Sequence, residues 1–160
     1  MRRHALWMLG LAATIALAAV VAAVVWWWDV EHEGIRLEAI RKALDATPAA
    51  PRPLHDQARA LQRRLSGILV ELQGDRRLGA RSVPTPVAIS ERANTISGEL
   101  NRTLARPTAT HEQQFQIASE LFVAQRSALK ALVENDVPAI ERELERLGAP
   151  YTPGRIPRNL

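Results

Sequence analysis

Residues 54–72 read LHDQARALQRRLSGILVEL and carry the clearest structural pattern in the chain. Their apolar side chains recur at intervals of three and four residues, and residues spaced in this way share one face of an α-helix. The set is Leu54, Ala58, Leu61, Leu65, Ile68 and Leu72. The stretch therefore predicts an amphipathic helix with one side packed into a core, and Gly74 is placed to end it.

The rest of the chain after Asp29 has the same helical spacing, and no segment alternates like a β-strand. Thr85-Pro86 fits an N-cap with proline at the first helical position, and Thr110 with Gln113 fits a capping box. Two more apolar stripes follow: Ile89, Ala93, Ile96 and Leu100, and then Phe115, Ala118, Phe122, Gln125, Leu129 and Leu132. The fold class predicted is all-α, an antiparallel bundle of three or four helices.

Prolines interrupt this helical pattern. A short helix is expected from Ile35 to Ala46, and TPAAPRP at 47–53 cannot be helix interior because it holds three prolines. Asp136 and Pro138 are expected to kink the chain or restart a helix.

The N-terminal segment 5–28 carries no charged side chain, whereas every acidic residue lies at Asp29 or later. As a helix it would be roughly 36 Å long, enough to cross a hydrocarbon core of about 30 Å. The competing interpretation is a cleaved signal peptide, since Ala16-Leu17-Ala18 resembles a cleavage site. An apolar region of this length favours an uncleaved transmembrane helix.

Charge gives this helix a direction. Arg2 and Arg3 precede it and acidic residues follow it, so the N-terminus is expected in the cytoplasm and the remainder outside the inner membrane of a bacterium. Trp7 would then lie at the inner interface. The outer interface would hold Trp26, Trp27 and Trp28.

Small residues repeat along the same segment, as they do where membrane helices pack closely. One row is Gly10, Thr14, Ala18 and Ala22, and a second is Ala12, Ala16, Ala19 and Ala23. The expected organisation is a cytoplasmic N-terminus (1–4), a transmembrane helix (5–28), a juxtamembrane helix with a Pro-rich linker (29–53), a helical domain (54–148) and an extended tail (149–160).

Composition excludes several classes of function. The net charge of +4 includes Arg2 and Arg3, and the other charges are mixed in sign along each segment. Nucleic-acid binders gather positive charge on one face, so nucleic acid is not an expected partner. The chain has no cysteine, which excludes thiol catalysis and Cys-ligated zinc.

Four segments resemble a known family. They are LQGDRRL (72–78), VPTPVAISERANTI (83–96), RPTATHEQQFQIASELF (106–122) and VPAIERELERLGAPYTPGRIP (137–157). Residues 54–157 are similar to the helical C-terminal region of bacterial sialidase-like (sortilin-type, BNR-repeat) β-propeller proteins, without the propeller. The resemblance implies a helical appendage with a packing or docking role and no catalytic residue.

No motif in the sequence indicates a catalytic or metal-binding site. His4, His32, His55 and His111 do not form a metal-binding pair, and we expect no catalytic, cofactor-binding or metal site. Candidate residues for docking an acidic partner or lipid headgroups are instead Arg64, Arg76, Arg77, Arg81, Tyr151, Arg155 and Arg158.

These features predict a non-catalytic accessory or scaffold subunit that stabilises a larger inner-membrane complex. Its expected partners are integral membrane subunits and membrane lipid, and respiratory or photosynthetic assemblies are the hosts considered. The alternative is a free-standing, membrane-tethered adaptor module on the periplasmic side.

Overall fold

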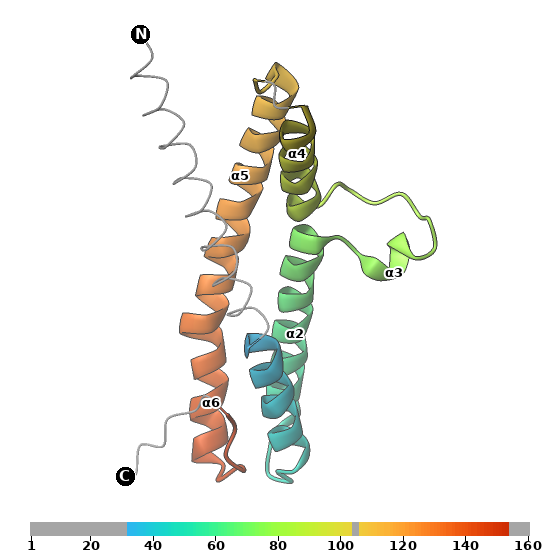
Figure 1. Cartoon of the computed structure of the whole chain (residues 1–160). Helices are drawn as coiled ribbons and strands as arrows, with labels where there is room; N and C mark the ends of the chain where they lie inside the picture. The colour runs from blue at the N-terminus through green and yellow to red at the C-terminus, as the bar shows by residue number, and fades with distance from the viewer. Residues whose placement is uncertain (1–31, 104–105, 154–160) are drawn as a thin grey trace.

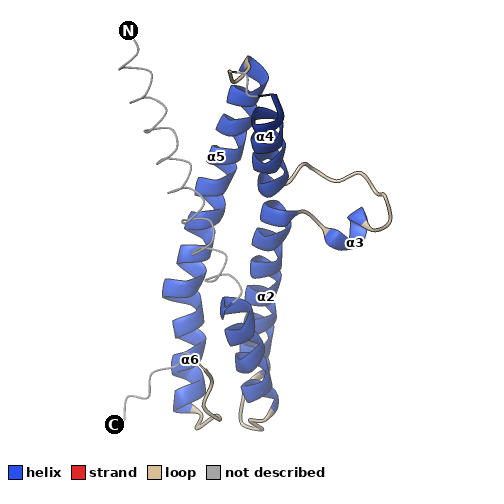
Figure 2. Ribbon diagram, in the orientation of Figure 1, coloured by secondary structure: helices blue, strands red, loops and turns tan. Residues whose placement is uncertain are grey.

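The computed structural model describes residues 32–103 and 106–153, and the part of the chain it describes is helical without β-strands (Figure 2). The all-α class is therefore confirmed. The N-terminal segment 5–28 lies outside the described residues. Among the helices that are described, none is both long and apolar enough to cross a membrane.

The chain first runs down one side of the molecule and then turns back. Residues 32–45 are helical, and α2 (Arg52–Gln73) returns antiparallel to them after the Pro-rich turn (Figure 1). All six apolar residues of the predicted α2 stripe are buried. Gly74 ends α2 with a positive φ of 81°, and its N–H donates to the Val70 carbonyl. Glycine adopts that backbone conformation without a Cβ penalty.

A short excursion separates α2 from the next long helix. It contains the single-turn helix α3 (Arg76–Gly79) and extended residues 83–88, and it projects to one side of the molecule (Figure 1). Helix α4 (Ile89–Thr103) then continues in the direction of α2. The predicted cap at Thr85-Pro86 is wrong. The chain stays extended until buried Ala88 returns to Gly74, where an added Cβ would lie 3.7 Å from the Ala88 Cβ.

The returning half of the molecule is one continuous helical rod. It consists of α5 (Ala109–Ala131), a π-helical turn η1 (Leu132–Asp136) and α6 (Val137–Arg146), and it is roughly 55 Å long. The predicted capping box is wrong by two residues. Thr108 is the N-cap, and the His111 side chain performs the reciprocal role that Gln113 was expected to fill.

The break expected at Asp136 and Pro138 does not occur. Proline has no N–H to donate and its ring would clash with a carbonyl one turn earlier. The wider π turn, in which the Val137 N–H donates to the Leu132 carbonyl, lets the helix continue through Pro138.

The core is concentrated at one end of the molecule. There the helix 32–45 and the first half of α2 pack against η1 and α6, and we call this region the three-helix end. Its most deeply buried apolar residues are Leu37, Ile40, Leu44, Leu132, Val137, Ile140 and Leu144. The opposite region, α4 packed on the first half of α5, is called the two-helix end.

The two-helix end corrects the predicted α5 stripe. Ala118, Leu129 and Leu132 are buried as expected, but Phe115 is 66% exposed. Of the described helices, α4 is the one that covers α5 at this level, so a side chain at the edge of the stripe has no second described helix to pack against (Figure 1).

Candidate functional site

The α3 excursion, residues 74–88, gathers three of the seven predicted docking residues on one projecting arm. Arg76, Arg77 and Arg81 are all exposed. The Asp75 carboxylate caps α3 by accepting hydrogen bonds from the Arg77 and Leu78 backbone N–H groups. The Asp75 cap orders the start of α3. Arg76 donates one long hydrogen bond to Gln73 at 3.3 Å, and the exposed guanidinium groups keep donors for an acidic or phosphate-bearing partner.

Apolar side chains accompany these cations. Leu78, Val83 and Val87 belong to the same arm and are exposed. A surface that combines Arg with exposed aliphatic groups has the composition found in protein–protein interfaces. We refer to residues 74–88 below as the basic arm.

The remaining predicted docking residues do not join this arm. Arg64 lies on α2, about two and a half turns before that helix ends. Its guanidinium pairs with Asp136 of η1 and links α2 to the rod. Tyr151 is exposed beyond α6, next to buried Thr152. Arg155 and Arg158 lie outside the described residues.

The predicted membrane residues also lie outside the described residues. They comprise the topology pair Arg2 and Arg3, the interfacial tryptophans and both rows of small residues. They remain predictions from sequence.

A cavity of about 480 Å³ opens where the helix 32–45 begins. One wall is His32 and Glu33, and the other is the rod at the junction of α5 with η1. The rod contributes Arg126, Leu129, Lys130, Val133 and Glu134. The cavity therefore has an apolar floor with charged groups at its rim, next to a π turn, a feature that is frequent at functional sites.

A largely buried ion pair joins Arg36, a few residues after the cavity wall at His32 and Glu33, to Glu141 of α6. The Arg36 guanidinium donates two hydrogen bonds to the Glu141 carboxylate, at 2.7 and 2.6 Å, and a third to Glu33 at 3.2 Å. Glu141 is only 6% exposed. The hydrogen bond to Glu141 raises the pKa of Arg36, so the guanidinium stays charged. Its role is to fix the helix 32–45 against α6.

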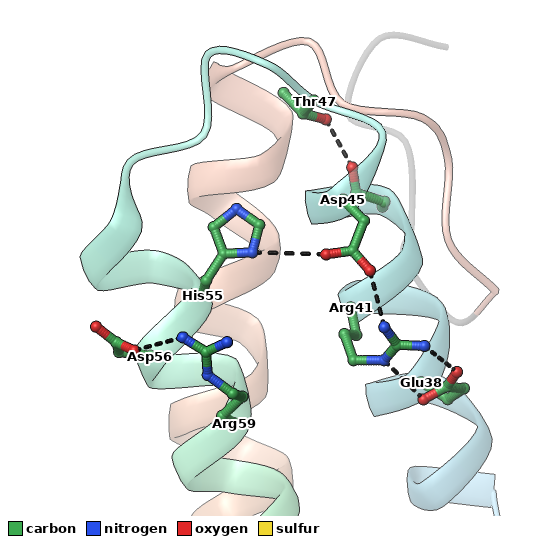
Figure 3. Close-up of polar contacts among 8 residues, drawn as sticks. Glu38, Arg41, Asp45, Thr47, His55, Asp56 and Arg59 are labelled. Atoms are coloured by element: carbon green, nitrogen blue, oxygen red, sulfur yellow. Dashed lines mark hydrogen bonds and ion pairs between the residues drawn. The ribbon is translucent and has the colours of Figure 1, made fainter.

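A second polar cluster fastens the same helix to α2. Asp45 accepts a hydrogen bond from Arg41 at 2.8 Å and lies 3.7 Å from His55 Nδ1 (Figure 3). Arg41 also binds Glu38 through two nitrogens. All these groups are exposed or half-buried, so the cluster positions helices and forms no enclosed reaction site.

A histidine lies in the first turn of α5. His111 Nδ1 accepts the Thr108 N–H, which leaves the proton on Nε2 to bind Glu99 at 2.6 Å. This histidine caps α5 and ties it to α4. Within the described ranges, no group of three or more His, Cys, Asp or Glu side chains could hold a metal ion.

Sequence reasoning missed the cavity, the Arg36–Glu141 pair and the His111 cap. The cavity and the ion pair join residues about a hundred positions apart, and no local spacing reveals such contacts. Comparison with protein-family models, with curated proteins and with solved structures found no match. The resemblance to the appendage of sialidase-like propeller proteins stays a prediction from sequence.

Proposed function

We propose that this chain is a non-catalytic accessory subunit of a larger bacterial inner-membrane complex. Residues 5–28 would anchor it in the membrane, and the helical domain would brace the extracytoplasmic parts of neighbouring integral subunits. The observation that carries the proposal is the basic arm, because it projects from the helices, exposes its cations and, apart from buried Ala88 at its end, contributes no residue to the core.

The distribution of apolar side chains supports a binding role. The arm exposes Leu78, Val83 and Val87, and the two-helix end exposes Phe115 and Val123. A monomer gains nothing from leaving such groups in water, and exposed apolar groups that cluster mark interaction surfaces.

The shape also suits a brace. The rod from Ala109 to Arg146 is roughly 55 Å long and so offers an extended surface. Helices spread over such a length bury little surface per residue by themselves, and a partner would add contacts along the two-helix end.

The alternative proposal is a free-standing tethered adaptor that recruits a soluble periplasmic protein. The same arm would serve as its docking site. The two proposals differ in the partner: a subunit stays with integral membrane proteins in constant ratio, whereas an adaptor associates with a soluble protein or purifies alone.

The test is extraction of the native membrane in mild detergent, followed by native electrophoresis and mass spectrometry of the band that holds this chain. A large band with constant stoichiometry supports the subunit proposal. A band of monomer or dimer size contradicts it and favours the adaptor.

Two matched double variants test whether the basic arm makes the contact with the complex. Arg76→Glu with Arg77→Glu should release the chain from the large band. Arg52→Glu with Arg63→Glu changes net charge equally on exposed positions of α2 and should leave the band intact. Equal release by both pairs would mean that overall charge, and not the arm, governs assembly.

A further inference from the structure

No described helix covers one flank of α5 along most of its length. Phe115 and Val123 are 66% and 63% exposed, and Arg126 and Lys130 continue the same flank at helical spacing. The flank ends in the cavity lined by Arg126, Leu129, Lys130 and Val133. It thus combines large apolar groups with two cations, and we call it the α5 flank.

The chain reaches the α5 flank from its N-terminal side. His32 and Glu33 form the opposite wall of the cavity, so whatever precedes residue 32 leaves the domain beside this flank. The uncharged run ends at Trp28, and the few residues between Trp28 and His32 can span at most about 14 Å. This step rests on the proposed function, in which residues 5–28 lie in the bilayer.

The two-helix end restricts how the domain can sit on that bilayer. From Lys130, which lines the cavity together with His32, α5 extends roughly 30 Å back to Ala109, opposite to the direction in which the helix 32–45 runs (Figure 1). This end carries exposed Glu91, Arg102 and Glu112, and such charges are costly in hydrocarbon. An upright domain would push them into the membrane.

We propose that the domain lies flat, with the α5 flank against the phospholipid headgroup layer and the rod parallel to the membrane plane. Phe115 and Val123 then contact the boundary between headgroups and acyl chains, while Arg126 and Lys130 bind lipid phosphates. Lys130 lies 3.9 Å from Glu134, and Arg126 makes no hydrogen bond or ion pair with any described residue. Figure 1 shows α5 and the basic arm on opposite sides of α2 and α4, so in this orientation the arm faces the aqueous phase, where extracytoplasmic parts of partners would reach it.

The absence of cysteine permits a direct test in the full chain. Val123→Cys on the flank and Val83→Cys on the basic arm both replace exposed valines, so neither should disturb the core. Each is labelled with an environment-sensitive fluorophore and reconstituted into vesicles of phosphatidylcholine and phosphatidylglycerol. Flotation after alkaline washing first establishes whether the chain is anchored.

The expected result is an anchored chain in which a headgroup-attached nitroxide lipid quenches the label at Val123→Cys and not the label at Val83→Cys. Adding Arg126→Glu and Lys130→Glu should lower the association constant of the flank for the vesicle surface about five-fold for each basic side chain removed, measured as loss of lipid quenching at the Val123→Cys label.

Other outcomes overturn the inference in distinguishable ways. An anchored chain with equal quenching at both sites contradicts the flat orientation alone. A Val123→Cys label that is shielded from a water-soluble quencher yet untouched by the lipid quencher means that protein, including the chain's own residues 5–28, covers the flank. A chain that does not float contradicts both the orientation and the proposed anchor.

Discussion

The three-helix end and the two-helix end are built from equally helical sequence but differ in what covers their helices. At the three-helix end each helix has two neighbours, and seven large apolar side chains are almost completely buried. At the two-helix end, within the part of the chain that the structure describes, α4 and the first half of α5 pack mainly on each other. Ile96, Leu100 and Phe122 are half-buried there, and Phe115 is exposed. Periodicity therefore predicts a helix, whereas burial depends on the number of neighbours.

This difference assigns separate roles to the two ends. The three-helix end supplies most of the stability of the domain, because burial of apolar area is the main favourable term in folding. The two-helix end and the basic arm instead provide exposed surface for contacts with partners. Regions with few buried contacts open more readily and are those that binding partners stabilise.

The largest expected effect is from truncating a core leucine. Leu144→Ala should lower the free energy of unfolding by about 3 kcal/mol, because Leu144 is fully buried. Leu100→Ala, at a half-buried position of α4, should cost roughly 1 kcal/mol. Denaturant unfolding of the purified full chain, followed by circular dichroism, measures both. Equal losses would remove the distinction between the two ends.

Breaking the Arg36–Glu141 ion pair at the three-helix end should have the second-largest effect on the free energy of unfolding. Arg36→Met leaves the Glu141 carboxylate buried without its partner and should cost about 2 kcal/mol, a value reduced because Arg36 is partly exposed. The double change Arg36→Met with Glu141→Leu should recover most of that loss. If the double variant is as unstable as the single one, packing of Arg36 and not charge is what matters.

Glycine substitutions test local backbone geometry with opposite signs. Gly67 and Gly98 lie within helices with nothing near an added Cβ, so changing either to Ala should add about 0.5–1 kcal/mol of stability. Gly148 ends the last helix with a φ of 65°, and Gly148→Ala should cost about 1 kcal/mol. Thermal unfolding of the three variants gives the signs, and stabilisation by Gly148→Ala would contradict the assigned backbone conformation.

The smallest expected effect is on the dependence of stability on pH. Hydrogen bonds from Arg41 and Arg59 lower the pKa values of Glu38 and Asp56 below their ordinary values of 4.5 and 3.8. Their contribution is present above those ordinary values and is lost as the pH falls through the lowered pKa values. Acid titration of stability should therefore show a slightly shallower decline in the Arg41→Gln and Arg59→Gln variants. A steeper decline would mean that these carboxylates are not stabilised by their arginines.

The sequence predicted the helical class, the α2 stripe and its end at Gly74, because each depends on neighbours within a few residues. It misplaced the start of α4, since the contact of Ala88 with Gly74 that returns the chain to α2 is not local. It predicted a break at Pro138 because proline disrupts an α-helix, and a π turn was not anticipated.

The positions of the predicted docking residues were likewise foreseeable only where they depend on local sequence. The Arg cluster around α3 was foreseen from its charge and its loop, but Arg64 was grouped with it by proximity in sequence and instead pairs with Asp136. The exposure of Phe115 and Val123 and the cavity beside His32 depend on which helices fail to cover α5, and no property of α5 alone determines that.

Hydrogen exchange of the backbone amides, in the native complex and in the purified chain, tests the division of roles most directly. We expect the helix 32–45 and α6 to be equally protected in both, and α4 with the first half of α5 to exchange faster in the purified chain and to slow in the complex. Equal protection of α4 in the purified chain would contradict the claim that this end is completed by its surroundings.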